Sequence, residues 1–234
     1  MTAPADLAAL DADVVACRRC PRLIAWCSEV ARTKRAAYAD EDYWGGPVPG
    51  FGVSDPRVWI VGLAPAAHGA NRTGRMFTGD RSGDWLFAAL HRGGLATSTT
   101  STHRGDGQAL IGTRITATVH CAPPDNKPTT EERHACATWL DAEIALVEPS
   151  VRVMIALGGI AWTALLAALA RGGWQVARVP FGHDVDTTAT SPAGRTVILL
   201  ASYHPSQQNT FTGRLTEPML DAVVNRAAAA AGLR

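Results

Sequence analysis

The amino-acid sequence predicts an α/β protein in which a central, mainly parallel sheet lies between two layers of helices. Four apolar, β-branched runs have the length of buried strands, and they cover residues 58–64, 114–120, 151–158 and 196–202. Segments with helical spacing of their apolar residues alternate with these runs, at 84–92, 129–149 and 159–171, and 216–234 closes the chain. Strands that alternate with helices form parallel sheets covered on both faces. We therefore predict a three-layer α/β/α fold with a four-stranded sheet.

One domain accounts for the whole chain. Its 234 residues are 47% hydrophobic, enough for a buried core, and no repeat or linker divides residues 1–234. No run reaches the eighteen or so apolar residues of a membrane helix, and the N-terminus carries acids where an export signal carries bases. We therefore expect a cytoplasmic protein without a membrane partner. The net charge of +1 excludes neither a nucleic-acid partner nor a small substrate.

Five cysteines in such a chain are not expected to form disulfides, because cytosolic thiols are kept reduced. Cys17 and Cys20 form a C-x-x-C pair near the end of a predicted first helix, and Cys121 and Cys136 follow the second strand. Four cysteines suit tetrahedral zinc or a [4Fe–4S] cluster, and their spacing does not choose between them. Two alternatives to metal binding remain. Cys121 and Cys136 could be buried as small hydrophobic residues, or Cys17 and Cys20 could form a redox pair. Cys27 is interpreted as a packing residue.

Polar residues are concentrated in the loops that directly follow the predicted strands, which is where ligands bind to an open parallel sheet. The glycines of loop 62–80, GLAPAAHGANRTGRMFTGD, allow close approach of backbone to a ligand, but the loop matches neither the dinucleotide fingerprint nor the P-loop. Phe77 is either a stacking platform for a flat base or an aromatic anchor of this loop. His204 can donate a hydrogen bond to a developing anion or serve a structural role, and Ser206 and Asn209 can hold phosphate oxygens.

Five motifs together resemble one known family. They are the four cysteines, YWGGPVPGFG at 43–52, the loop 62–80, PPDNKP at 123–128 and HPSQQNTFTGRLT at 204–216. In this order they resemble the family 5 (type b) uracil-DNA glycosylases, an iron–sulfur branch of the uracil-DNA glycosylase superfamily. The match runs from Cys17 to Leu215, nearly the whole chain.

The resemblance implies a [4Fe–4S] cluster on Cys17, Cys20, Cys121 and Cys136. Its role would be architectural, because base excision moves no electrons. The partner would be double-stranded DNA that contains deaminated bases, bound by a monomer associated with the nucleoid.

The resemblance also assigns catalytic roles. Other branches carry an acidic residue in the first motif, where this chain has Leu63 and Ala64, so Asp80 becomes the candidate that faces the sugar; its alternative role is to cap the following helix. Asn126 and His204 complete the catalytic set. The residues that would bind the flipped base are Gly62, Ala64, Phe77, Asn126 and His204. The residues that would contact DNA are Arg72, Arg75, Lys127, Ser206, Asn209, Arg214 and Leu215, the last as a wedge in the duplex.

The predicted activity is monofunctional hydrolysis of uracil, hypoxanthine and possible further deaminated bases such as xanthine, for base excision repair. Small residues at Ala64 and Ala66 would leave room for purines, and only Lys34 and Lys127 could supply a lyase amine. Two other hypotheses remain: an iron–sulfur protein that binds damaged DNA without glycosylase activity, and a zinc-stabilised hydrolase of a small phosphorylated substrate.

Overall fold

A computed structural model describes residues 4–234, and its centre is a seven-stranded sheet with the order β1-β3-β2-β4-β7-β6-β5. The four inner strands are parallel: β3 (Thr113–Ala117), β2 (Val58–Gly62), β4 (Val153–Leu157) and β7 (Thr196–Ser202). They coincide with the four predicted apolar runs. Parallel strands of this kind are buried on both faces, and every residue of β2, β3 and β4 is buried.

The predicted number of strands was wrong, because three antiparallel edge strands carry little hydrophobic signal. β1 (Phe51–Gly52) pairs with β3, β6 (Asp186–Thr190) pairs with β7, and β5 (Gln175–Val176) pairs with β6. β1 and β5 are two residues long, and β6 reads DTTAT with only Ala189 buried. Such short or polar strands show no apolar periodicity in the sequence.

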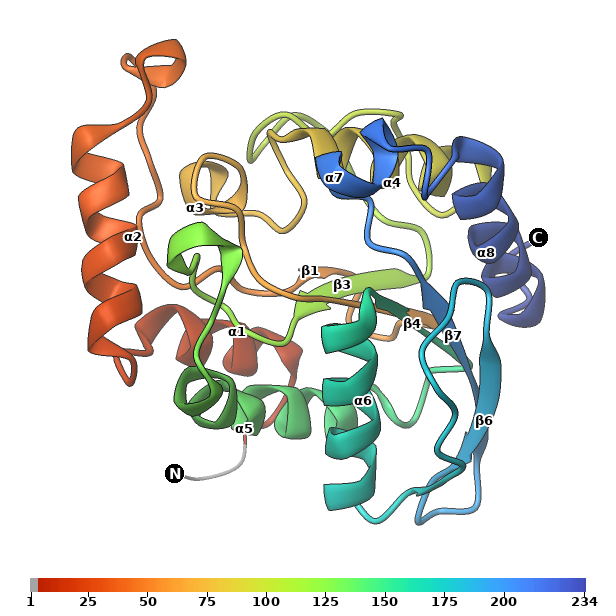
Figure 1. Cartoon of the computed structure of the whole chain (residues 1–234). Helices are drawn as coiled ribbons and strands as arrows, with labels where there is room; N and C mark the ends of the chain where they lie inside the picture. Colours follow the sequence, from red (N-terminus) through yellow and green to blue (C-terminus); the bar gives the residue numbers. More distant parts are fainter. Residues whose placement is uncertain (1–3) are drawn as a thin grey trace.

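Helices cover both faces of the sheet, which confirms the three-layer arrangement (Figure 1). One core joins the sheet to α1 (Leu7–Ala16), α5 (Thr130–Val147) and α6 (Gly159–Arg171), and the other joins it to α4 (Arg81–Arg92) and α8 (Glu217–Ala230). Alternate residues of each strand serve the two cores, because successive side chains point to opposite faces. Trp59 and Val61 belong to the first core, and Val58 and Ile60 to the second.

A buried ionic group fixes the N-terminal helix to the sheet. Arg114 on β3 donates from Nε to Oε1 of Glu143 on α5 at 2.7 Å, and from Nη2 to Oδ1 of Asp11 on α1 at 2.6 Å. Trp59 Nε1 donates to the same Glu143 oxygen at 3.1 Å. Because removal of one partner would leave a buried charge uncompensated, this group sets where α1, and therefore Cys17, lies.

The remaining elements lie mostly beyond the carboxyl ends of the parallel strands. They are α2 (Pro21–Thr33), η1 (Ala36–Tyr38), α3 (Ala70–Thr73), η2 (Pro124–Asn126) and α7 (Gln207–Phe211). The segment after α2, orange in Figure 1, projects beyond the rest of the molecule. Among residues 4–234, no helix combines the length and the apolar character needed to cross a membrane.

Candidate active site

A cavity of about 620 Å³ opens at the carboxyl ends of β2, β3 and β7, where the sequence placed the ligand site. It is formed by the loop after β2, by η2 and its flanks, and by the start of α7. The predicted residues that line it are Gly62, Ala64, Phe77, Asp80, Asn126, Lys127, His204 and Ser206. Three segments that lie far apart in the sequence therefore meet at one pocket.

Asp80 caps a helix and also lines the cavity. Its Oδ1 accepts a hydrogen bond from the backbone N–H of Gly83 at 2.9 Å and caps α4. Its Oδ2 lies so close to Gly69 that a Cβ on that glycine would stand 1.9 Å away. Burial raises the pKa of Asp80, while the amides of Gly83 and Ser82 act against that shift. The carboxyl group is thus held in one orientation at the wall of the cavity.

Phe77 and His204 form the aromatic side of the cavity. Their ring centroids are 5.7 Å apart and their planes are inclined by 31°. Phe77 has a positive φ of 51°, which is costly for a residue with a bulky side chain and is typical of functional sites. Its ring edge packs on Gly62, where a Cβ would lie 2.9 Å from Phe77 Cε2. Only a glycine at the end of β2 allows this ring position.

His204 is neutral at physiological pH, because burial lowers its pKa to about 4. A neutral imidazole carries one N–H that can donate to a carbonyl or to an anion. The backbone oxygen of His204 accepts a hydrogen bond from Asn209 Nδ2 at 2.9 Å. Asn209 therefore holds the His204 loop, and its side chain lines a second cavity beside the first.

The η2 turn supplies the opposite wall. Asp125 and Asn126 both have positive φ, at 53° and 56°, so the turn bends sharply and directs both residues to the cavity. Lys127 follows them and lies exposed at the rim. Sequence reasoning missed Asp125, Arg81, Gln207 and Gln208 as lining residues. Their position beside predicted site residues was the only signal for them.

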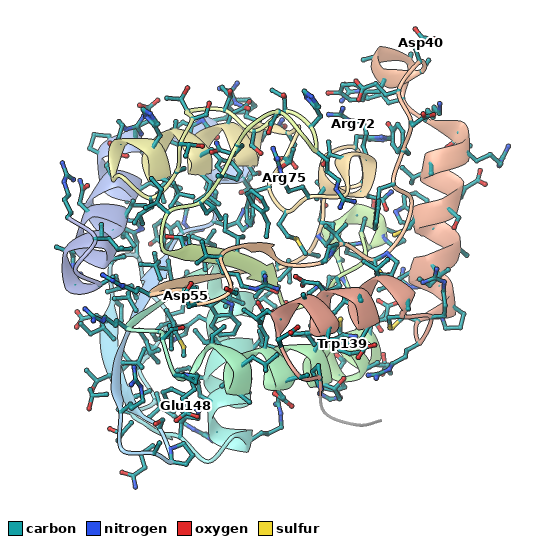
Figure 2. The ribbon with its side chains drawn as sticks, turned by 180° about the vertical axis from the view of Figure 1, so that it is seen from behind. Asp40, Asp55, Arg72, Arg75, Trp139 and Glu148 are labelled. Carbon is teal, nitrogen blue, oxygen red and sulfur yellow. The ribbon has the colours of Figure 1, made fainter. Side chains whose placement is uncertain are left out.

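The sequence predicts that Arg72 and Arg75 contact DNA phosphate, but in this structure both side chains are only about 6% exposed and are engaged by protein partners. Both are labelled in Figure 2. Arg72 donates to the backbone oxygens of His68 and Gly79, both at 2.8 Å, and forms an ion pair with Glu41.

Arg75 is held in a similar way. It donates to Ser101 Oγ and to Asp106 Oδ2, each at 2.6 Å, and to Thr78 Oγ1 at 3.0 Å. Buried guanidinium groups need such partners, and here they fix the shape of the loop 62–80.

Leu215 also differs from its prediction. Its side chain is fully buried in the core beneath α8, so it is not available as a wedge in this structure. Its backbone N–H donates to the oxygen of Asn209, which turns the chain inward. Phe211, four residues earlier in the same motif, is 67% exposed, and the Arg81 guanidinium lies 4.8 Å from its ring centre. Arg214 is exposed, as a DNA contact requires.

Cys17, Cys20, Cys121 and Cys136 line one small apolar cavity between α1, α2, α5 and the loop after β3. The backbone N–H of His120 points at Cys136 Sγ from 3.4 Å, the kind of contact that thiolate ligands accept. Among residues 4–234, no three His, Cys, Asp or Glu side chains converge closely enough to hold a single ion. Four thiols around one shared space are a donor set of the kind that binds tetrahedral zinc or a [4Fe–4S] cluster.

Cys27 does not line this cavity, although its thiol is hydrogen-bonded to that of Cys121. It is fully buried in the core, and its Sγ lies 3.5 Å from the backbone oxygen of Ala122. It therefore packs α2 against the loop that carries Cys121.

Fold and site together define an α/β protein with a pocket at the carboxyl ends of its parallel strands. Comparison with known proteins is consistent with this. Residues 49–228 match the family model described as the uracil DNA glycosylase superfamily. The chain is 55% identical to a Type-5 uracil-DNA glycosylase of Mycobacterium leprae, over 96% of this chain and 95% of that protein. It is 51% identical to one of Thermus thermophilus, over 94% and 96%. The chain therefore belongs to the type-5 family of the uracil-DNA glycosylase superfamily.

A more distant relative supports the same placement. A Type-4 uracil-DNA glycosylase of Pyrobaculum aerophilum is 35% identical over 70% of this chain and 74% of that protein. The resemblance found in the motifs is thus confirmed over nearly the whole chain.

Proposed function

We propose that this protein is a monofunctional glycosylase that hydrolyses the bond between deoxyribose and uracil in double-stranded DNA. The observation that carries this proposal is the meeting of Asp80, Asn126 and His204 around one cavity that also holds the Phe77 ring. The family membership supports the same reaction. A base that is paired in a duplex cannot reach such a cavity, so the target nucleotide must first leave the helix.

Each side chain would have a defined task. Phe77 would stack on the flipped base, and Asn126 would bind its polar edge. As the bond between C1′ and the base nitrogen breaks, the electron pair leaves with the base and the sugar becomes positively charged. The neutral His204 would donate to the base oxygen that gains negative charge, and the Asp80 carboxylate would stabilise the sugar or position the water that adds to C1′.

The experiment that tests this is base release from duplexes with a single uracil. Strand breaks that appear only after alkali would support monofunctional hydrolysis. Tight binding of the uracil duplex without any base release would contradict it and favour a damage-binding protein. The Asp80→Asn and Asn126→Ala variants should each lose at least about a hundredfold in rate, in the range typical of a lost electrostatic contact. An undiminished rate in both would contradict the catalytic assignment.

Lysine chemistry separates this reaction from that of a lyase. A lyase needs an amine that attacks C1′, and Lys127 stands at the rim of the cavity. We expect no covalent complex when uracil duplexes are treated with borohydride during the reaction. A complex that disappears in Lys127→Ala would contradict the monofunctional assignment.

Broad specificity is part of the proposal. Ala64 and Ala66 line the cavity with small side chains, which leaves space for the second ring of a purine. We expect hypoxanthine to be released more slowly than uracil. Xanthine is tested in the same assay. Failure to release any purine from a duplex, in a preparation that releases uracil, would restrict the substrate to pyrimidines.

Bound DNA would be held open by an apolar side chain inserted into the stack. Phe211 replaces Leu215 in this proposal, because Phe211 is the exposed aromatic residue of the motif and Leu215 is buried. Arg214, Lys127 and Ser206 would contact phosphates near it. Phe211→Ala should slow excision from duplexes more than from single strands, since only a duplex must be opened.

We also propose that the four-thiol cavity holds a [4Fe–4S] cluster. Such a cluster would supply structural cross-links between thiolates and no chemistry for base excision. Iron and acid-labile sulfide should be present in the purified protein and fall strongly in Cys136→Ser. Cys27→Ser, at the packing cysteine, should keep both. Zinc in place of iron, or metal retained by Cys136→Ser, would contradict this proposal.

A further inference from the structure

A second cavity, of about 460 Å³, lies directly beside the catalytic one. The two cavities share Leu63, His204 and Gln208 as walls. The second cavity extends from these residues across the start of α6 to Phe181 and Arg214. The second cavity therefore adjoins the catalytic one across the His204 loop.

The lining of this second cavity includes the rings of Phe181 and Tyr203 among aliphatic residues. Tyr203 lies between two rings, with its centroid 5.2 Å from that of His183 and 6.0 Å from that of Phe181. Phe181 and Tyr203 are half-buried, so part of their surface faces the cavity. Phe181 packs on Gly159 at the start of α6, where a Cβ would lie 3.3 Å from its ring. Tightly packed core aromatics leave no such space beside them.

A cation and two amides complete the lining. The Arg214 guanidinium lies 4.6 Å from the centre of the Tyr203 ring, and Arg214 is exposed. Gln208 and Asn209 border the cavity and can bind the edge of a heterocycle. Aromatic faces together with arginine are what single nucleobases stack on in proteins. The catalytic scheme above gives no role to the rings of Phe181 and Tyr203.

We propose that the second cavity binds the base of the nucleotide adjacent to the lesion on the same strand. This rests on the proposed function. Successive nucleotides of one strand are only about 3.4 Å apart along a helix and about twice that when the strand is extended. With one base in the catalytic cavity, the neighbouring base therefore lies within reach of the adjoining cavity. Arg214 is exposed and lines that second cavity, which suits it to bind the phosphate that links the two nucleotides.

The test uses single-stranded oligonucleotides with one uracil. Each neighbouring nucleotide is replaced in turn by an abasic tetrahydrofuran unit, which keeps the phosphates and removes one base. We expect replacement at one adjacent position to lower kcat/KM of the wild-type protein about tenfold, the size of one stacked base. Replacement two or more positions away should have little effect.

The Phe181→Ala variant shows whether Phe181 is the partner of that base. It should lose about the same factor on the complete oligonucleotide, and it should be insensitive to the tetrahydrofuran unit at the adjacent position. Phe181→Leu, which keeps apolar bulk without a ring, guards against loss of folding and should also be less sensitive than the wild type. Ile111→Ala is the matched control, because Ile111 is 44% exposed and precedes the amino end of β3, while both cavities lie at the carboxyl ends of the parallel strands. It should keep the sensitivity of the wild type.

The outcomes separate this inference from the proposed function. A wild-type protein that excises uracil but is insensitive to every replacement overturns the second site alone. The second site is also overturned if the tetrahydrofuran unit lowers kcat/KM of Phe181→Ala as much as that of the wild-type protein. If no uracil is released either from these oligonucleotides or from the uracil duplex, the proposed glycosylase fails. In that case the affinities for the same oligonucleotides are measured by fluorescence anisotropy. The second site is then tested by whether a tetrahydrofuran unit at the adjacent position weakens binding by the wild-type protein but not by Phe181→Ala.

Discussion

Arg72 Nη2 donates to the backbone oxygen of Gly79 at 2.8 Å, one residue before the catalytic candidate Asp80. The same guanidinium donates to His68 at the other side of the loop, and it stacks 3.9 Å from the ring centre of Tyr38. One buried cation thus joins both sides of the loop 62–80 to the segment after α2. Its positive charge also lowers the pKa of Asp80, against the larger effect of burial.

Arg72→Gln should therefore raise the pKa of Asp80 further. Because Arg72 makes the smallest of the contributions to this pKa, we expect a small shift of the acidic limb of the pH profile of single-turnover uracil excision to higher pH. A variant that only loosened the loop would lose rate equally at all pH values. Arg92→Gln removes a surface pair with Asp221 and should leave the profile unchanged. An acidic limb that stays in place in Arg72→Gln would contradict the electrostatic role.

The two roles of Asp80 can be separated by substitution. Serine is a good N-cap residue and alanine is not, so Asp80→Ser should be about 1 kcal/mol more stable than Asp80→Ala in urea unfolding. Both variants lack the carboxylate and should lose excision to the same extent. An active Asp80→Ser protein would mean that Asp80 serves only to cap α4.

Gly69 tests how closely the carboxylate must approach the backbone. A methyl group on Gly69 would stand 1.9 Å from Asp80 Oδ2, so Gly69→Ala must displace the carboxyl group. Excision should fall at least about a hundredfold while the protein stays folded, which circular dichroism can check. At Gly46 the nearest atom to an added Cβ is 4.0 Å away, and Gly46→Ala should keep its activity. Equal rates in the two variants would contradict this geometry.

His204 should make stability depend on pH. Its pKa falls from 6.5 in the unfolded chain to about 4 in the folded protein, so the unfolded state binds the proton more tightly. The contribution is fully present above pH 6.5 and is lost as the pH falls toward 4. Against His204→Gln, the wild-type protein should lose roughly 3 kcal/mol of unfolding free energy over this range. If the unfolding free energies of the two proteins, measured with urea, changed by the same amount between the two pH values, the buried, neutral state of His204 would be contradicted.

The sequence predicts the centre of the fold because the four inner strands are buried on both faces and read as apolar runs. The same pattern predicts that the loops after these strands meet at one edge, which brings Phe77, Asn126 and His204 together. It misses β6, because an edge strand such as DTTAT needs no apolar side chains.

The errors in the site have a common physical origin. A sequence shows the charge of Arg72 or Arg75 but not the acids that fold back on it from 31 residues away in each case. It shows an apolar residue at Leu215 and another at Phe211 but not which one a turn directs inward. Contacts between distant segments decide these cases, and local spacing carries no information about them.

Lys127 is one of only two lysines in the chain, and it stands at the mouth of the catalytic cavity. The other, Lys34, donates from Nζ to the backbone oxygen of Ala39 on the projecting segment. In a Lys34→Arg background, an amine-reactive dye would attach at the cavity rim and, apart from the chain terminus, at no other amine. The arginine-rich composition thus provides a selective optical label for the arrival of DNA at the pocket.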